Sequence, residues 1–358
     1  MKAKIGNEKI SERHKTFIVF EAGATHTGLS SAKKLVDFSK AAGADAIKFQ
    51  LVSDVSKITK NKKINFSYKI LLKNNKFKKI TEKYHKIIKR RSMSLDHWSK
   101  LFSYCKKKKI KCFCSIEDFE DIKFVASKNV DTIKISSSDC VNLPLIEYAA
   151  KTKKCIQIDT GNSTLKEIEQ AIFTIRSVGN NNIIVHYNPP NYPTEIKNVS
   201  LKNINYLKKK FNVAVGFSDH SPGELISYIS ITKGANLIEK TITQNKYQKS
   251  VEHCMSLEVN DLANFVKNVR DIETITNSKI NFIDRIKSNV KKTRKSLFCN
   301  RNIRKGEILK ITDFSFLSPE SGLTPKKFYE IIKKNKSILA ARNIKKGKRL
   351  FVADIKIK

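Results

Sequence analysis

Short apolar segments alternate regularly with longer amphipathic segments through most of this chain. Each short run, rich in β-branched residues, predicts a buried strand, and each segment with apolar residues every three or four positions predicts a helix. The expected strands are 16–20, 45–50, 110–114, 132–135, 155–158, 182–187, 213–217 and 236–241, and the expected helices are 30–42, 94–107, 117–127, 143–151, 164–178, 201–210, 223–233 and 259–274. This alternation favours a closed (β/α)8 TIM barrel, an α/β fold, over the alternative of an open doubly wound sheet.

Two stretches interrupt the pattern. Residues 51–93 are rich in lysine and too long for an ordinary loop, so we expect them to be functional or locally helical. Residues 281–293 are polar and basic, and we interpret them as a linker. The expected domains are therefore a barrel over residues 1–280 and a small domain over residues 294–358.

An internal repeat characterises the small domain. Residues 301–309, RNIRKGEIL, recur as residues 342–350, RNIKKGKRL, and Asp313 and Asp354 follow the two copies at the same offset. The shared glycine is suited to a turn that needs positive φ. The repeat therefore predicts a small β-rich domain with pseudo-two-fold symmetry.

The formal net charge of +38 raises the alternative of a polyanion-binding protein. The lysines are spread along the whole chain together with abundant Ile and Asn, which is typical of AT-rich codon usage and not of a nucleic-acid site. The leader 1–15 lacks the apolar segment of a signal peptide, no run is long enough to span a membrane, and the seven cysteines include no CxxC pair. We therefore expect a soluble cytoplasmic protein with reduced thiols, without a membrane or specific nucleic-acid partner, that binds polyanions only non-specifically at low salt.

Polar side chains follow every expected strand. In strand order they are Glu21 and His26; Lys48 and Gln50; Ser115; Lys134, Ser137 and Asp139; Asp159 and Thr160; His186, Asn188, Asn191 and Tyr192; Ser218, Asp219 and His220; and Glu239, Lys240 and Thr241. Because the carboxyl ends of barrel strands form one face, these groups are expected to converge. Two lysines with several hydroxyls suit a small phosphate or carboxylate ligand, and Glu21, Asp139 and His220 suit proton transfer or metal binding.

Each of these residues also has a purely structural interpretation. Lys48 and Lys134 are equally suited to pairing with core carboxylates, because a charge inside a strand is costly without an opposite one. His186, inside a strand, is more typical of a hydrogen-bonded core histidine than of a ligand. The convergence of many polar strand ends is what favours a site.

Seven segments, in order, resemble the sialic-acid synthase family. They are FEAGATHTG (20–28), AAGADAIKFQ (41–50), IKISSSD (133–139), NYPT (191–194), VGFSDH (215–220), LIEK (237–240) and EHCMSLE (252–258). The resemblance implies condensation of phosphoenolpyruvate with an N-acylated amino sugar, N-acetylmannosamine-like or a 6-deoxy diamino hexose, to give a nonulosonic acid and phosphate. It also implies a C-terminal SAF (antifreeze-like) domain and a domain-swapped homodimer in which each SAF domain covers the partner's barrel.

The resemblance assigns roles to individual positions. The residues matching the phosphoenolpyruvate site are Lys48, Ser115, Lys134, Ser137 and Ser218, and those matching the sugar site are Gln50, Asn191, Tyr192 and Glu252. Glu21, Asp139 and His220 match catalytic positions. His220 also matches one of two histidines that ligate a divalent metal, Mn²⁺ or Mg²⁺.

The chain departs from the family pattern at several of these places. Thr241 occupies the position of the second metal histidine, and a hydroxyl is a poorer ligand than imidazole. Ser136 and Ser138 replace glycines, and Ser318-Pro-Glu320 replaces a segment that carries a sugar-binding arginine. The alternative function is therefore a catalytically weakened barrel that serves as a phosphoenolpyruvate- or sugar-binding or regulatory protein.

Overall fold

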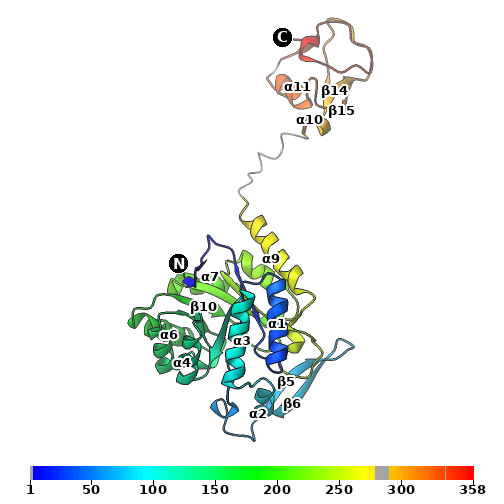
Figure 1. Cartoon of the computed structure of the whole chain (residues 1–358). Helices are drawn as coiled ribbons and strands as arrows, with labels where there is room; N and C mark the ends of the chain where they lie inside the picture. The colour runs from blue at the N-terminus through cyan, green and yellow to red at the C-terminus, as the bar shows by residue number, and fades with distance from the viewer. Residues whose placement is uncertain (1–2, 279–289, 335) are drawn as a thin grey trace. The chain divides into compact units, whose positions relative to one another are not determined.

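The structure, a computed structural model, describes residues 3–278, 290–334 and 336–358 (Figure 1). The chain divides into two compact units, Met1–Asn277 and Ser278–Lys358. Most of the expected linker 281–293 lies outside the described residues, and its described end forms the short helix α10 (Val290–Thr293).

Parallel strands in the first unit close into a barrel. They are β3 (Phe17–Glu21), β4 (Ala46–Gln50), β7 (Lys111–Ile116), β8 (Thr132–Ile135), β9 (Cys155–Asp159), β10 (Ile183–Tyr187), β11 (Ala214–Asp219) and β12 (Leu237–Thr243). Each strand pairs with the next in this order, and β12 pairs with β3 to complete the ring. The (β/α)8 barrel is thus confirmed and the open doubly wound sheet is excluded.

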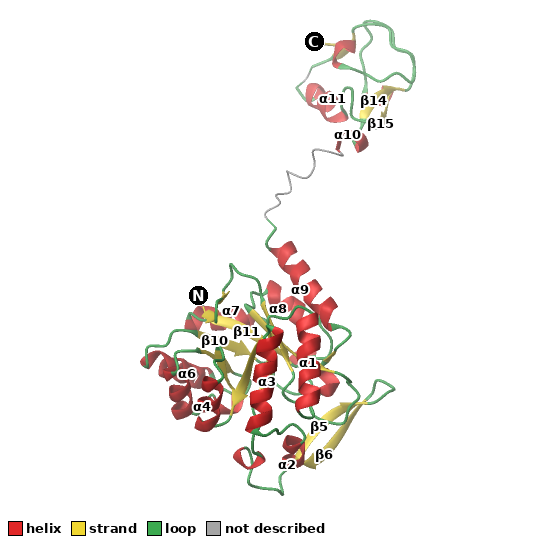
Figure 2. Cartoon of the chain, in the orientation of Figure 1, coloured by secondary structure: helices red, strands yellow, loops and turns green. Residues whose placement is uncertain are grey.

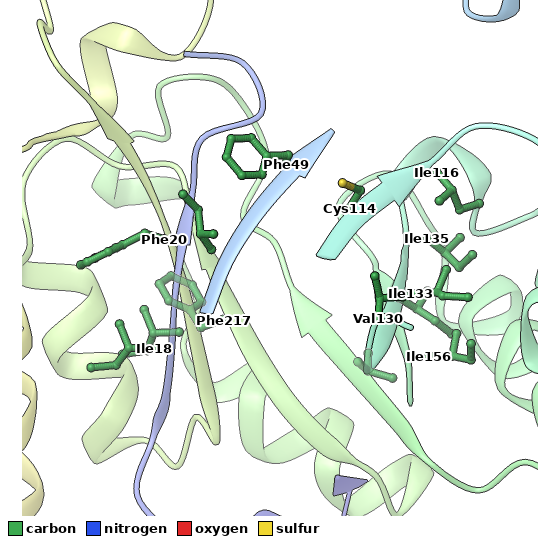
Figure 3. Close-up of a cluster of buried hydrophobic side chains, with 14 of the residues drawn as sticks. Ile18, Phe20, Phe49, Cys114, Ile116, Val130, Ile133, Ile135, Ile156 and Phe217 are labelled. Carbon is green, nitrogen blue, oxygen red and sulfur yellow. The ribbon is translucent and has the colours of Figure 1, made fainter. Parts of the chain in front are cut away.

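Helices cover the outside of the barrel (Figure 2). They are α1 (Leu29–Ala41), α3 (Leu95–Lys108), α4 (Phe119–Ser127), α5 (Leu143–Lys151), α6 (Leu165–Ser177), α7 (Lys202–Phe211), α8 (Leu225–Thr232) and α9 (Leu262–Thr276). Outward strand residues such as Phe20, Phe49 and Ile133 pack beneath these helices in one large apolar core (Figure 3). No helix in the described ranges is long and apolar enough to cross a bilayer.

A second apolar core fills the amino-terminal end of the barrel. The inward strand residues there are Phe17, Val19, Ala46, Phe113, Cys155, Ile184, Ala214 and Leu237. A small antiparallel hairpin, β1 (Ala3–Ile5) and β2 (Glu8–Ile10), contributes Ala3, Ile5 and Ile10 to the same core. The leader therefore closes the amino-terminal end of the barrel. The sequence had indicated only that this leader lacks the apolar segment of a signal peptide.

The lysine-rich stretch 51–93 is ordered mainly as a β-hairpin. Strands β5 (Asn65–Leu71) and β6 (Phe77–Lys83) pair antiparallel, and the one-and-a-half-turn helix α2 (Tyr84–Lys89) follows. Figure 1 shows hairpin and helix together at one end of the barrel. The expectation of local helix was thus correct for α2 and for a single 3-10 turn at Val55–Lys57. Between them the chain forms a hairpin, because Asn74 and Asn75, the latter with positive φ, form the turn that reverses the chain.

The C-terminal unit is small and β-rich, as expected. It contains β14 (Ser296–Cys299), β15 (Phe314–Leu317), α11 (Pro325–Ile332), β16 (Ile338–Ala340) and β17 (Ile355–Ile357). β14 pairs with β15 and β16 with β17, both antiparallel. β13 (Leu257–Glu258), by contrast, belongs to the first unit and extends the sheet beside β12.

The internal repeat is visible as matched contacts. Arg301 Nε lies 2.9 Å from Asp313 Oδ1, and Arg342 Nε lies 2.6 Å from Asp354 Oδ1. The repeated glycines, Gly306 and Gly347, both have positive φ. The two equivalent aspartates thus hold the two turn units in the same way, which explains their equal offset.

Candidate active site

Two lysines from β4 and β8, strands that only β7 separates in the barrel, meet at one carboxylate. Lys134 Nζ on β8 lies 2.6 Å from Glu239 Oε2, and Lys48 Nζ on β4 lies 3.4 Å from Glu239 Oε1. All three residues point into the barrel because side chains alternate between the two faces of a strand. The two ammonium groups therefore converge within the width of a single carboxylate.

Two further carboxylates complete this ionised cluster. Glu21 Oε1 lies 3.4 Å from Lys48 Nζ, and Asp159 Oδ1 lies 3.0 Å from Lys134 Nζ. Burial alone raises the pKa of Glu239, yet the lysine ammonium groups hold it well below its usual range. Burial alone lowers the pKa of Lys48, yet the carboxylates of Glu239 and Glu21 hold it well above its usual range. Lys48, Glu239 and Asp159, whose pKa the Lys134 ammonium group holds below its usual value, are thus ionised at neutral pH.

The functional and structural interpretations of the two lysines are therefore compatible. Both lysines pair with core carboxylates, and both also lie at the carboxyl-terminal mouth of the barrel. Lys134 is fully buried, and Ser218 Oγ lies 3.4 Å from its ammonium group.

A cavity of about 540 Å³, which we call the inner cavity, opens above the cluster. Its walls bring together nine of the predicted site residues: Glu21, Lys48, Gln50, Ser115, Ser137, Asp139, Tyr192, His220 and Glu252. Lys134 and Ser218 are completely buried and are not among its lining residues.

A second cavity of about 750 Å³, the outer cavity, adjoins it beneath the β5–β6 hairpin. Residues of the hairpin, including Tyr68 and Lys79, form part of its wall, and Asn191 lines it from the loop after β10. The residues that line both cavities are Gln50, Tyr84, Arg91, Tyr192 and Glu252. The predicted sugar-site residues therefore lie at and beyond the boundary between the two cavities.

His220 is the imidazole exposed to the inner cavity. Burial lowers its pKa to about 4, so the ring is neutral at pH 7. Its Nδ1 atom is buried without a hydrogen-bond partner among the described residues, and the Tyr192 ring packs against it at 4.2 Å between centroids. A neutral ring with a free lone pair is suited to binding a cation.

Thr241 is buried on β12, beside Glu21 in the strand register. Within the described part of the chain, no three His, Cys, Asp or Glu side chains are grouped as metal ligands. The residues present therefore fit only a cation such as Mg²⁺ or Mn²⁺ that takes most of its ligands from substrate oxygens and water, with His220 as one protein donor.

Below the ionised cluster, His186 is fully buried and hydrogen-bonded on both sides. Its Nε2 lies 2.7 Å from Gln157 Oε1 and its Nδ1 lies 3.0 Å from Ser218 Oγ. A Cβ at Gly216 would lie 2.9 Å from this ring, so any residue other than glycine at this position would clash with the ring. His186 is a core histidine that supports Ser218 from below.

Sequence reasoning missed several members of the site. Glu239 and Asp159 were noted only as polar strand ends, although their inward register on β12 and β9 was a usable signal. Arg91 and Glu117 line the inner cavity from loops, and no sequence pattern pointed to them.

Two carboxyl groups of the inner cavity hold protons unusually well. Burial and the nearby Asp139 raise the pKa of Glu117 to about 7. Burial and the nearby Glu21 raise the pKa of Glu252 to about 8. Glu252 is therefore a proton donor at neutral pH, next to carboxylates that are acceptors.

Comparison with known proteins identifies what this arrangement resembles. The family model described as NeuB family matches residues 35–281. The N,N'-diacetyllegionaminic acid synthase of Campylobacter jejuni is 30% identical over 89% of this chain and 95% of its own length. The N-acetylneuraminate-9-phosphate synthase of Drosophila melanogaster is 29% identical over 89% and 91%.

Solved structures agree with this result. The N-acetylneuraminic acid synthetase of Leptospira borgpetersenii, in complex with citrate, superposes with a TM-score of 0.69 at 26% identity, covering 81% of this chain and 94% of that one. The spore coat polysaccharide biosynthesis protein SpsE of Bacillus subtilis superposes with a TM-score of 0.65 at 25% identity over the whole of both chains.

Proposed function

The chain belongs to the NeuB family, and we propose that it condenses phosphoenolpyruvate with an N-acylated amino sugar to give a nonulosonic acid and inorganic phosphate. Relatives that make legionaminic, pseudaminic and neuraminic acids support this reaction class. The observation that carries the proposal is the convergence of Lys48 and Lys134 on Glu239 beneath the inner cavity.

In this proposal the inner cavity holds phosphoenolpyruvate. Lys48, Ser115 and Ser137 line the cavity and offer donors to its phosphate and carboxylate oxygens. Lys134 acts from just beneath, where its buried ammonium group contributes a strong positive potential because little water screens it.

The reaction then forms one C–C bond and breaks one C–O bond. C3 of phosphoenolpyruvate attacks the aldehyde carbon of the open-chain sugar, and the aldehyde oxygen takes a proton, for which the protonated Glu252 is placed. Water adds to the cationic C2 and loses a proton to a nearby carboxylate, Glu21 or Asp139. The bond between C2 and the bridging oxygen then breaks, phosphate leaves with that oxygen, and the new C2 hydroxyl gives its proton to the departing phosphate as C2 becomes the keto carbon.

The charges of the cluster support a requirement for a divalent cation. Two ammonium groups face three carboxylates, those of Glu21, Asp159 and Glu239, so the cluster has a negative balance before the anionic substrate binds. We propose that Mg²⁺ or Mn²⁺ binds through His220 and substrate oxygens. A bound cation would polarise the sugar aldehyde.

The decisive experiment follows an isotope. Purified protein is incubated with phosphoenolpyruvate labelled with ¹⁸O at the C2–O–P bridge, Mn²⁺, and a panel of N-acyl hexosamines. We expect sugar-dependent release of phosphate that contains the label, together with a nine-carbon keto acid detected by mass spectrometry. Unlabelled phosphate, or release that does not depend on sugar, would contradict the proposed reaction.

Thr241 favours the second candidate function, a barrel that binds these ligands without efficient turnover. In that case calorimetry would detect binding of phosphoenolpyruvate while the isotope assay detects no product. Replacing Thr241 with His separates the two: a large gain of activity supports the weakened barrel, and little change supports an enzyme adapted to threonine.

The domain-swapped homodimer, the SAF identity of the C-terminal unit and the cytoplasmic location remain predictions. Light scattering of the full chain tests the first of these, since a dimer is required if the C-terminal unit is to cover a partner's barrel.

A further inference from the structure

Two adjacent arginines after α2 differ in their ion pairs, although each has one buried guanidinium nitrogen without a hydrogen-bond partner. The Arg90 guanidinium forms hydrogen bonds of 2.8 and 2.9 Å to the two carboxylate oxygens of Glu82 on β6. Arg91 instead lines both the inner and the outer cavity. Its Nε atom is buried without a hydrogen-bond partner, and its side chain has no ion pair with any residue that the structure describes.

Among the described cations that line the two cavities, those that form ion pairs are Lys48, Lys57 and Lys69, whose partners are Glu21 and Glu239, Asp118 and Asp121, and Glu195, respectively. Arg91 and Lys79 form none. Lys79 is exposed on β6, where solvent stabilises its charge. The Nε atom of Arg91, by contrast, is buried away from solvent.

The acidic groups nearest to Arg91 do not compensate it fully. Glu117 and Glu252 interact with it electrostatically, but neither comes within ion-pair distance. Both hold their protons to unusually high pH, as described above, so each carries only part of a negative charge near pH 7. Tyr84, on the same wall, is neutral. A buried guanidinium donor without an acceptor costs free energy that a ligand can recover.

Resting on the proposed function, we propose that the outer cavity binds the sugar substrate and that Arg91 binds an anionic group on that sugar, a phosphate monoester or a carboxylate. A guanidinium suits both groups because its planar N–H donors pair with two oxygens at once. Lys79 stands at the rim of the same cavity and adds positive potential that attracts an anion. A neutral sugar of the same class offers this arginine only hydroxyl and acyl oxygens, which carry no charge to balance the guanidinium.

Direct binding tests the proposal without relying on turnover. Calorimetry measures the affinity of the full chain for N-acetylmannosamine, for its 6-phosphate, and for the corresponding 6-carboxylate. We expect at least one anionic form to bind ten times or more tightly than the neutral sugar, and the tighter of the two identifies the anion.

Variants then locate the anion. Arg91→Gln should abolish the preference for the anionic sugar while changing affinity for the neutral sugar less than threefold, and Arg91→Lys should retain part of the preference. Lys89→Gln, an equal change of charge at an exposed position on α2, serves as the matched control and should leave the preference intact. Melting temperatures establish that each variant is folded.

The results separate this inference from the proposed function. Equal binding of neutral and anionic sugars, binding of neither, or equal weakening of both by Arg91→Gln would overturn the role of Arg91, whether or not labelled phosphate is released. An Arg91-dependent preference with no phosphoenolpyruvate reaction for any sugar would support the anion site and contradict the synthase.

Discussion

The two ends of the barrel interior differ although the same strands build them. At the amino-terminal end Ala46 on β4 and Leu237 on β12 belong to the plugged apolar core. Two residues further along, on the same inward face, Lys48 and Glu239 belong to the ionised cluster. A distance of two residues along each strand thus separates the apolar layer, which stabilises the fold, from the layer of charged side chains at the candidate site.

The two layers contribute unequally to the free energy of folding. Apolar side chains in the lower layer stabilise the fold by about 25 cal/mol per Å² of surface removed from water. Ion pairs in the upper layer lose solvation that their attraction barely offsets, so hydrophobic replacements would be as stable or more so. A costly layer that faces a cavity indicates selection for chemistry and not for stability.

The largest effect should come from the upper layer. Lys134→Ala is expected to abolish phosphoenolpyruvate binding and, because Glu239 and Asp159 lose a buried partner, to lower the free energy of unfolding by about 3–5 kcal/mol. The protein should still fold in the absence of denaturant. Calorimetry with phosphoenolpyruvate and urea unfolding measure the two effects, and intact binding would refute the site.

A substitution in the lower layer should reduce stability without reducing activity. Leu237→Ala, two residues before Glu239, is expected to cost about 2–5 kcal/mol of unfolding free energy through a cavity in the plugged core. Its kcat/KM at low temperature should stay close to that of the unmodified protein. A loss of activity comparable to that of Lys134→Ala would show that the two layers are coupled.

The boundary between the layers is testable at Gly216. Gly216→Ala places a methyl group against the His186 ring and is expected to cost about 1–3 kcal/mol. Since His186 supports Ser218, activity should also fall, though less than in Lys134→Ala. Unchanged stability and activity would show that the His186 ring can move aside and that its position is not needed to support Ser218.

A separate effect concerns the dependence of stability on pH. The pKa of Glu252 is raised from 4.5 to about 8, so the folded state keeps a proton that the unfolded state loses, and stability falls as pH rises from about 4.5 to 8. Glu252→Gln removes this contribution, so its melting temperature relative to the unmodified protein should rise over that interval. Glu169→Gln, exposed on α6, is the control. A difference that does not vary with pH would contradict the raised pKa.

The barrel strands were predictable because their apolar runs are short, regular and bounded by polar residues. Predicted 132–135 and observed β8 coincide, as do predicted 143–151 and observed α5. The leader and the stretch 51–93 were less predictable. The strands of the leader are short, and its apolar residues Ile5 and Ile10 are buried only because the barrel end receives them. The strands β5 and β6 are longer, but most of their side chains are exposed or half-buried, so no apolar pattern marks them.

The candidate site divides in the same way. Lys48, Lys134 and His220 could be proposed from the sequence because strand ends are recognisable in a linear pattern and because the motifs resemble a family. Arg91 was not, since its importance lies in lacking the partner that Arg90 has. No local pattern reports an unpaired charge.

Local spacing and side-chain chemistry were therefore enough to establish the order of strands and helices, the barrel, the repeat and the polar face. Closure of the ring brought Glu239 from β12 between Lys48 and Lys134, and folding of the hairpin over the mouth enclosed Arg91 between two cavities. These contacts join residues far apart in the chain, and the charge balance and pKa of each group depend on which neighbours share its burial. Only the three-dimensional arrangement decides that.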